Sequence, residues 1–416
     1  MALASEQPEQ SHSTGTHHRA HRLRKVGVRI ATMLFGLLLA WLLVEVGIRV
    51  AYAALPMNLQ IALRDVHVTP FTDQQLAPPS LWQPDGDYLT AVRPGVTDSL
   101  QAGSPTVTFH VSSYAWWGGR VGFRSPQPQD GNVPAAALGD SFTFCFTEVS
   151  DCWVSLVAQH LGLNIANLGQ PVTGSTSHAR IYYDFVAKPE LRIKQPKLVL
   201  WQFYGNDYND DYGLAQINGT AKTPPEPVPA SRPLPQGALA VWLRANSALY
   251  VIASGLLRGK DPGIDQFVDP FHVNKPGLDL WFGQSYIRNA FDMSQPRNLE
   301  GEMLSQQAIM QTRDLVEKNG GQFVVLVVPA KEEVYRSLTE PLIGKAAVDG
   351  IAAPRLRLLD YCAAQHVVCF DLLPALQAQA DQGQQVYFPT DPHLNILGNQ
   401  IAASAISDFL QQGVLK

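Results

Sequence analysis

The chain has 416 residues, a length that allows two or three folding units. Its formal net charge is -5, 16% of its residues are charged and 46% are hydrophobic, which is enough apolar material for an ordinary globular core. The body of the chain has no basic stripe, which argues against a nucleic-acid-binding protein.

Residues 1–25 form a polar N-terminal segment. It contains four histidines: His12, His17, His18 and His21. A metal site on these histidines is one interpretation. A disordered, solvated tail in the cytoplasm is the favoured one, because the segment has little apolar surface to bury.

Residues 26–54 are predicted to cross the membrane once. The uncharged centre of this segment, Ile30–Val44, ends at Glu45, whose carboxylate is expected to reach water at the outer interface. Five basic residues precede or begin the segment: Arg19, Arg22, Arg24, Lys25 and Arg29. Because positive residues stay in the cytoplasm, the rest of the chain is expected outside a bacterial cytoplasmic membrane.

A cleaved signal peptide is the alternative for this segment. Residues 51–53 (Ala-Tyr-Ala) resemble a cleavage site. Glu45 and Arg49 interrupt the apolar run before that site, which favours an uncut anchor.

Residues 55–130 are rich in proline, threonine and valine and predict an extracytoplasmic extension that contains β-strands. Its aromatic cluster, Tyr114, Trp116 and Trp117, can stack on a sugar or pack in a core. Packing is the favoured interpretation, because large aromatic side chains usually bury their rings.

From residue 131 to 416 strands alternate with helices, which predicts an α/β domain with a parallel sheet. The expected strands are Pro134–Leu138, Asn164–Asn167, Leu198–Phe203, Phe323–Val328 and Val367–Asp371. The expected helices are Trp153–Leu161, His178–Ala187, Leu304–Asn319, Ala353–Ala364 and Ile396–Gln411. An insertion of about 213–300 separates the third strand from the fourth, either as a lid or as a packed element. It contains a proline-rich loop, Thr223–Pro235, and an apolar helix, Ala238–Leu257.

The four cysteines form two pairs with the same spacing: Cys145 with Cys152 and Cys362 with Cys369. An even count with repeated spacing outside the cytoplasm predicts two local disulfides. On the chain-entropy account a loop of this size stabilises by roughly 2.5 kcal/mol. Zinc binding is disfavoured because the CxxC spacing is absent, and buried free thiols are the remaining alternative.

Polar residues follow the expected strands at the sheet edge where ligands bind in open parallel sheets. Gly139, Asp140 and Ser141 follow the first strand, Gly169 the second, and Asn206 with Asp207 the third. Asp391 and His393 precede the last helix. A serine becomes a nucleophile when an imidazole removes its proton and a carboxylate orients that imidazole.

Ser, Gly, Asn and His in this order resemble the four sequence blocks of the SGNH (GDSL-type) hydrolases. The resemblance implies a flavodoxin-like three-layer α/β/α domain over residues 131–416 with Ser141 as nucleophile. His393 and Asp391 complete the triad, and the oxyanion hole comprises Ser141, Gly169 and Asn206. Asp140 and Asp207 are expected to support these residues.

Two positions depart from the family pattern. Tyr204 stands where the third block has glycine, and one residue rather than two separates Asp391 from His393, so that Thr390 occupies the usual aspartate position. The shorter spacing resembles that of SGNH-type polysaccharide O-acetyltransferases, which arrange their blocks in another order.

The predicted function is that of an anchored serine esterase acting on O-acyl groups, above all O-acetyl groups, of cell-envelope polysaccharides. The alternatives are a polysaccharide O-acetyltransferase and a non-catalytic glycan-binding or assembly protein on the same scaffold. The expected partners are an ester-bearing substrate, including acylated glycans, and the lipid bilayer. No cofactor or metal is expected, because the acidic run around Asp207 lacks the Gly and Glu positions of an EF-hand loop.

Overall fold

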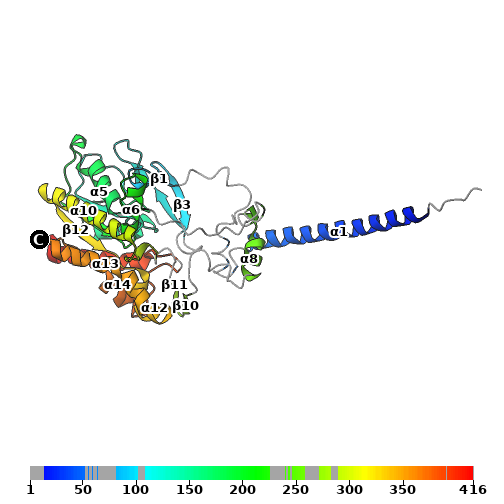
Figure 1. Ribbon diagram of the computed structural model, residues 1–416. Coiled ribbons are helices and arrows are strands. Elements are labelled where there is room, and N and C mark those ends of the chain that lie inside the picture. Colours follow the sequence, from blue (N-terminus) through cyan, green and yellow to red (C-terminus); the bar gives the residue numbers. More distant parts are fainter. Residues whose placement is uncertain are drawn as a thin grey trace, which may run out of the picture. The chain divides into compact units, whose positions relative to one another are not determined.

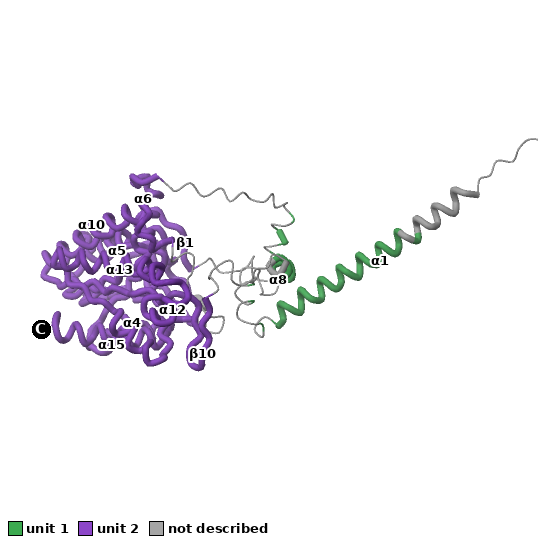
Figure 2. Tube along the Cα trace, turned by 60° about the horizontal axis from the view of Figure 1, so that its bottom comes forward, with its two compact units in different colours: residues 1–72, 236–263 green, residues 73–235, 264–416 purple. Residues whose placement is uncertain are grey.

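The computed structural model describes residues 14–51, 81–101, 108–224, 246–257, 271–282, 289–389 and 391–415, and positions 55, 59, 63, 239, 242 and 243. The chain divides into two compact units (Figure 2). Unit 1 comprises residues 1–72 and 236–263, and unit 2 comprises residues 73–235 and 264–416. The expected insertion is therefore divided, because its central part belongs to unit 1.

Unit 1 contains the helices α1 (Thr14–Val50) and α8 (Ala248–Leu257). Residues Gly27–Val50 of α1 are long and apolar enough to cross a membrane. The prediction of a disordered tail up to residue 25 is wrong from Thr14 onward, where α1 begins. Adding turns to an existing helix costs much less than nucleating one, so a polar segment with good helix formers continues the apolar helix. Residues 1–13 and the cleavage-like site at 52–53 lie outside the described residues.

Unit 2 is built on a five-stranded sheet with the order β13-β12-β9-β7-β8. The strands are β7 (Ala135–Leu138), β8 (Ile165–Asn167), β9 (Leu198–Phe203), β12 (Gln322–Val327) and β13 (Cys369–Asp371). All neighbouring pairs in this sheet are parallel. This is the flavodoxin-like order, and the predicted α/β fold is confirmed.

Both faces of the sheet are buried. Side chains alternate between these two faces along each strand, so each strand contributes to two cores. In β9, Leu198 and Leu200 belong to one core, while Val199, Trp201 and Phe203 belong to the other. The first core includes residues of α4 (Trp153–Leu161), α14 (Leu373–Ala380) and α15 (Ile396–Phe409). The second includes residues of α5 (Ser175–Tyr182), α10 (Pro296–Lys318) and α13 (Lys345–Gln365). These layers are visible in Figure 1.

The remaining helical elements of unit 2 are short. They are α3 (Ser141–Phe144), η3 (Val149–Asp151), η4 (Tyr183–Ala187), η5 (Pro189–Leu191), α6 (Asp207–Ile217), α11 (Lys331–Val334), α12 (Arg336–Ile343) and η6 (Leu410–Val414). The sequence did not predict α11, α12 or α14. It also placed the starts of α10 and α13 about eight residues too late.

The predicted extension contains three antiparallel pairs in its described part. They are β1 (Trp82–Asp85) with β2 (Leu89–Val92), β3 (Thr97–Gln101) with β4 (Thr108–Ser112), and β5 (Tyr114–Ala115) with β6 (Gly122–Phe123). Trp116 is fully buried, and the Trp117 ring N–H donates to the Phe185 carbonyl, so both tryptophans pack within the protein.

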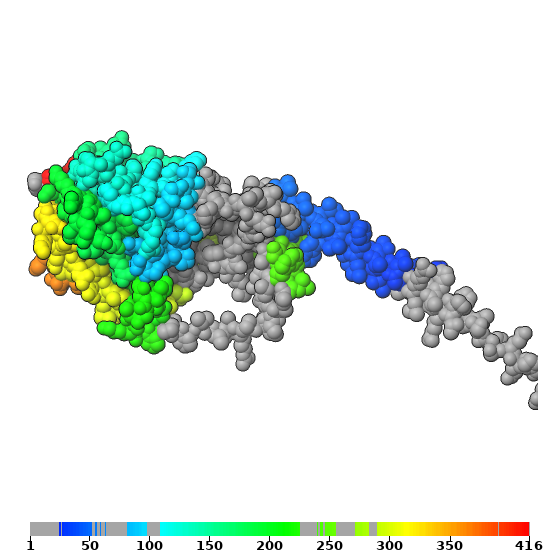
Figure 3. Space-filling view, turned by 90° about the horizontal axis from the view of Figure 1, so that it is seen from above, coloured from blue at the N-terminus to red at the C-terminus, as the bar shows by residue number. Residues whose placement is uncertain are grey.

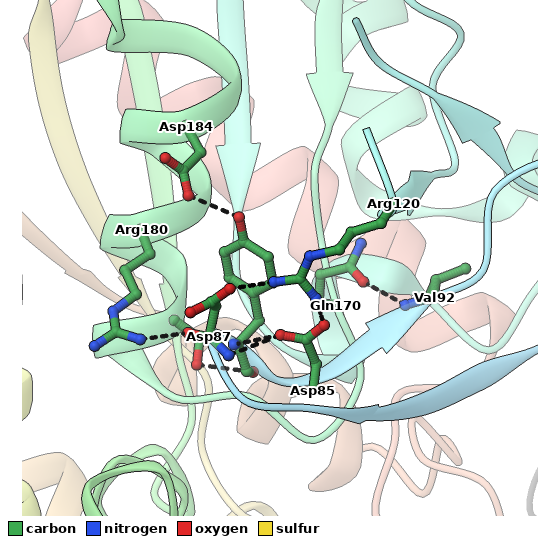
Figure 4. A network of polar contacts seen from close by, with 9 residues as sticks. Asp85, Asp87, Val92, Arg120, Gln170, Arg180 and Asp184 are labelled. Carbon is green, nitrogen blue, oxygen red and sulfur yellow. Dashed lines mark hydrogen bonds and ion pairs between the residues drawn. The ribbon is translucent and has the colours of Figure 1, made fainter. Parts of the chain in front are cut away.

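Polar contacts tie this extension to the α/β layers (Figure 4). The Tyr88 hydroxyl donates to Asp184 at 2.7 Å, Arg180 donates to the Asp87 carbonyl at 2.8 Å, and the Val92 N–H donates to Gln170 at 2.8 Å. The two parts form one continuous surface, in which the extension is light blue to cyan (Figure 3). Residues 73–130 of the predicted extension thus belong to unit 2, whereas residues 55–72 belong to unit 1.

The described part of the insertion in unit 2 contains the hairpin β10 (Phe271–Lys275) and β11 (Leu278–Phe282). Leu280 and Phe282 are fully buried in the first core. The hairpin is therefore packed against the domain. Residues 225–235 of the predicted proline-rich loop lie outside the described residues.

Both predicted disulfides are present in the structure. Cys145 is bonded to Cys152 with their Cα atoms 5.6 Å apart, and Cys362 to Cys369 with their Cα atoms 6.1 Å apart. The first closes the segment directly after Ser141, and the second joins the end of α13 to β13.

Candidate active site

Ser141 lies at the carboxyl edge of the sheet, as the first residue of α3. Gly139 links β7 to this helix, and a Cβ on Gly139 would lie 2.3 Å from Gln202 Oε1. The Asp140 side chain accepts a hydrogen bond from the Phe142 N–H at 2.9 Å and so caps α3. The tight turn therefore requires glycine and presents the serine at the point where the strand ends.

The structure brings Ser141, His393 and Asp391 together although 252 positions separate the serine from the histidine. His393 Nε2 lies 2.6 Å from Ser141 Oγ. His393 Nδ1 is hydrogen-bonded to Asp391 Oδ1, which also accepts the His393 backbone N–H at 2.9 Å. This is the geometry in which imidazole removes the serine proton while a carboxylate holds the other ring nitrogen.

The environment of the triad keeps Asp391 ionised. Burial alone would raise the pKa of Asp391, but the charge and hydrogen bonds of His393 and the Lys331 ammonium together hold it below its usual value. Phe142 and Phe146 pack against the His393 ring, with ring centroids 4.7 and 4.5 Å away. These aromatic rings restrict the orientation of the imidazole.

The predicted oxyanion residues differ in the hydrogen bonds that their N–H groups already make within the protein. The Gly169 N–H donates to Asn167 Oδ1 at 3.0 Å, so this donor is already used. A Cβ on Gly169 would lie 2.3 Å from the Phe144 nitrogen, so the glycine is needed for close contact with α3. The Asn206 amide donates one hydrogen bond to Asp210 at 2.9 Å, and its second N–H is the donor predicted to face the substrate. The oxyanion role of Ser141 and Asn206 stays a prediction.

Comparison with known proteins supports the resemblance to SGNH hydrolases. A family model described as "SGNH hydrolase-like domain, acetyltransferase AlgX" matches residues 286–416, which include Asp391 and His393. This match agrees with the resemblance that the four blocks, the triad and the sheet order indicate. Residues 286–416 of the chain are therefore similar to an SGNH hydrolase-like domain.

Individual SGNH relatives are distant. The "Probable alginate O-acetylase AlgJ" of Pseudomonas syringae pv. tomato is 28% identical over 160 residues, which are 34% of this chain and 35% of that protein. The chain thus matches about a third of the length of this curated relative.

Solved structures with similarity to the chain include a member of the lipolytic protein G-D-S-L family from Veillonella parvula. It is 10% identical, with a TM-score of 0.35, and the match covers 68% of this chain and 98% of that one. An acetyl-xylooligosaccharide esterase from Geobacillus Stearmophilus is 12% identical, with a TM-score of 0.34, and the match covers 67% and 92% of the two chains.

A cluster of buried carboxyl groups lies beneath the SGNH site: Asp140, Asp207, Asp210 and Asp211. Burial raises the pKa of Asp140 to about 6 and the pKa values of Asp210 and Asp211 to about 7. Burial, followed by the charge of Asp140, raises the pKa of Asp207 well above its usual value. These carboxyl groups therefore keep their protons to a higher pH than exposed carboxyl groups do. Within the described parts of the chain, no group of three or more His, Cys, Asp or Glu side chains could hold a metal ion.

The sequence analysis missed two buried cations that hold the loops of the triad. Arg124 is 3% exposed, and its guanidinium donates to the carbonyl oxygens of Phe144, Cys145 and Thr147 at 2.6–3.0 Å, directly after the Ser141 helix. Burial lowers the pKa of Arg124 to about 10, so it stays charged at neutral pH. Carbonyl groups that turn toward one point hold a cation by charge-assisted hydrogen bonds.

Lys331 is the corresponding cation under the loop of Asp391 and His393. Its side chain is fully buried, and Nζ donates to the carbonyl oxygens of Pro389 at 3.2 Å and Asp391 at 3.3 Å. Burial lowers the pKa of Lys331 to about 8. In sequence this lysine precedes two glutamates at the start of a short helix, a pattern that indicates solvent exposure; only tertiary contacts reveal its role.

Replacing Lys331 by methionine is expected to slow acylation of Ser141 by roughly 10–10²-fold, since small displacements of a catalytic group have effects of this size. In the wild type, Lys331 is protonated below pH about 8. The rate should therefore fall as the pH rises through that value, whereas the variant should lack this step. The measurement is the pH dependence of fluorophosphonate labelling.

The matched control for that experiment is Lys275→Met, which removes an exposed lysine from β10. It should keep both the rate and the pH profile. A Lys331→Met protein with an unchanged rate and profile would show that the cation does not position the loop.

Proposed function

We propose that the chain is an acyl-transfer enzyme that moves O-acyl groups, above all acetyl, of polysaccharides through a covalent intermediate on Ser141. The observation that carries this proposal is the 2.6 Å contact between Ser141 Oγ and His393 Nε2, with Asp391 on the opposite ring nitrogen. The AlgX-type family model and the O-acetylase relative support acetylated polysaccharide as the substrate class.

In the first half-reaction, Ser141 Oγ attacks the ester carbonyl while His393 Nε2 takes the serine proton. The negative charge that forms on the carbonyl oxygen is stabilised by N–H donors of Ser141 and Asn206. The C–O bond of the ester then breaks, His393 returns the proton to the leaving alcohol, and the acyl group remains on Ser141. Asp391 stays ionised and stabilises the imidazolium.

In the second half-reaction, an acceptor hydroxyl attacks the carbonyl carbon of the acyl-serine, and His393 removes the proton of that hydroxyl. The bond between Ser141 Oγ and the acyl carbon then breaks, and His393 returns the proton to Ser141 Oγ. Water as acceptor makes the enzyme an esterase, and a sugar hydroxyl makes it an O-acetyltransferase. The description of the matching family model as an acetyltransferase favours the sugar hydroxyl.

The experiment that tests this function supplies an activated aryl acetate with a panel of unacetylated and acetylated oligosaccharides. Free acetate and acetylated oligosaccharide are quantified by mass spectrometry. Transfer predicts acetylated sugar that increases with acceptor concentration, whereas an esterase yields acetate alone. If neither product exceeds the level of the Ser141→Ala protein on any member of the panel, the proposal fails.

We also propose that α1 crosses the bacterial cytoplasmic membrane with its N-terminus inside and the SGNH domain outside. The 24 residues Gly27–Val50 correspond to about 36 Å of helix, which exceeds the hydrocarbon thickness of about 30 Å. Their large apolar side chains are exposed, as a helix in lipid requires. The basic residues before Gly27 support this orientation.

A further inference from the structure

Glu45 of α1 does not reach toward water, in contrast to the expectation from the sequence. Its carboxylate accepts hydrogen bonds from the first groups of α8 instead. The donors are the Ala248 N–H at 2.8 Å, the Leu249 N–H at 3.0 Å and the Ser247 hydroxyl at 2.9 Å. A carboxylate at a helix N-terminus satisfies amides that lack intrahelical partners and complements the helix dipole.

Arg49, one turn along α1, completes this polar junction. Its guanidinium is 2.9 Å from Glu45 Oε1 and donates to the Asn246 carbonyl at 2.8 Å. The side chains of Arg49 and Glu45 are only 18% and 12% exposed. Charged groups near a bilayer are tolerated where they are paired and hydrogen-bonded within the protein. The junction therefore suits a site with little water.

The helix that Glu45 caps is apolar and short. Residues 246–257 include no charged residue. Ten residues, Ala248–Leu257, correspond to about 15 Å of helix, roughly half of the hydrocarbon thickness. Ala248 is fully buried in a small cluster with Leu63, against which Ile48 of α1 packs. α8 is thus attached to the end of α1 and is too short to cross a membrane itself.

Exposed apolar side chains stand on either side of the junction residues in the sequence. Val46 and Val50 of α1 are 54% and 82% exposed, and Trp242, shortly before α8, is 59% exposed. Tyr250 lies in the first turn of α8. Tryptophan and tyrosine are enriched at the membrane–water interface, where an apolar ring meets lipid and its polar group meets water.

We propose that α8 lies in the outer interfacial layer of the bilayer, beside the end of α1, with lipid as the partner of its apolar surface. The protein then contacts the membrane through two elements, and the Glu45–Arg49 junction holds the second against the first. This inference rests on the proposed membrane crossing of α1 and is independent of the enzymatic activity.

Site-specific fluorescence on the full chain in phospholipid nanodiscs tests the proposal. All four native cysteines form disulfides, so an introduced cysteine reacts alone. The variants are Tyr250→Cys in α8, Leu38→Cys in the middle of α1 and Lys275→Cys on unit 2, each labelled with an environment-sensitive dye. Spin-labelled lipids carry the quencher either near the headgroup or deep in the acyl chain.

We expect the label at position 250 to be quenched more by the shallow than by the deep spin label. The label at position 38 should show the reverse order, and the label at position 275 should be quenched by neither. In the Glu45→Leu background, quenching at position 250 should fall while that at position 38 persists, because the cap is lost and the span is kept.

Quenching at position 38 without quenching at position 250 would overturn the lipid contact of α8 and indicate a different occupant, such as a protein partner. No quenching at position 38 would overturn the membrane crossing itself. Unchanged quenching at position 250 in the Glu45→Leu background would overturn the role of the Glu45 junction.

Discussion

Ser141→Ala is expected to abolish acyl-enzyme formation and to lower turnover by a factor on the order of 10⁶, since members of a catalytic triad fail together. The structure supplies the reason: Ser141 Oγ is the hydroxyl that His393 Nε2 contacts. Without this oxygen there is no atom at that point to attack a carbonyl. Loss of fluorophosphonate labelling and of acetate release are the two measurements.

The matched control is Ser150→Ala, which removes an exposed hydroxyl from the neighbouring segment η3. It should label at the wild-type rate, and both variants should unfold at the wild-type temperature. His393→Ala should resemble Ser141→Ala, because the serine then has no base. Full activity of the Ser141→Ala protein on any ester would exclude Ser141 as the nucleophile, even though the fold would stand.

Asp391→Asn is expected to lower turnover by a factor on the order of 10⁴, as for other triads whose carboxylate becomes an amide. Asp391 Oδ1 accepts hydrogen bonds from both Nδ1 and the backbone N–H of His393. If the amide oxygen keeps the backbone bond, the NH₂ group can face Nδ1. The imidazole proton then moves to Nε2, where it blocks removal of the Ser141 proton.

The rate of fluorophosphonate labelling measures this loss directly. Asp381→Asn, which changes an exposed aspartate after α14, is the matched control and should have no effect. A nearly silent Asp391→Asn substitution would mean that another group orients His393. Thr390, at the usual aspartate position, lies outside the described residues. The contacts of Asp391 therefore carry the assignment of the carboxylate.

The insertion shows where pattern-based prediction failed. Its apolar helix was placed within the SGNH domain because it lies between the third and fourth strands of the sequence. In the structure α8 belongs to unit 1, where Glu45 caps it across about 200 positions, as the separation from Ala248 shows. Hydrophobicity indicates that such a helix must be covered, but it does not indicate by what.

The sequence by itself predicted the parallel α/β fold, the resemblance to SGNH hydrolases, the apolar N-terminal helix and the proximity of Ser141, Asp391 and His393. These features depend on patterns of neighbouring residues along the chain. The patterns are strands of alternating or continuous apolar residues, with reactive groups directly after them. Because parallel strands end at one edge, the positions of these groups along the chain predict that they lie close together. The equal spacing of the cysteine pairs belongs to the same class of local signals.

Only the tertiary structure decided how the site is supported. Arg124 and Lys331 were not distinguishable from surface cations until their burial and carbonyl partners were known. Gly169 was expected to donate to substrate, but its N–H is taken by Asn167 and its missing side chain makes room for α3. The physical reason is that burial and hydrogen-bond partners arise from contacts between distant segments, which residue type and spacing do not encode.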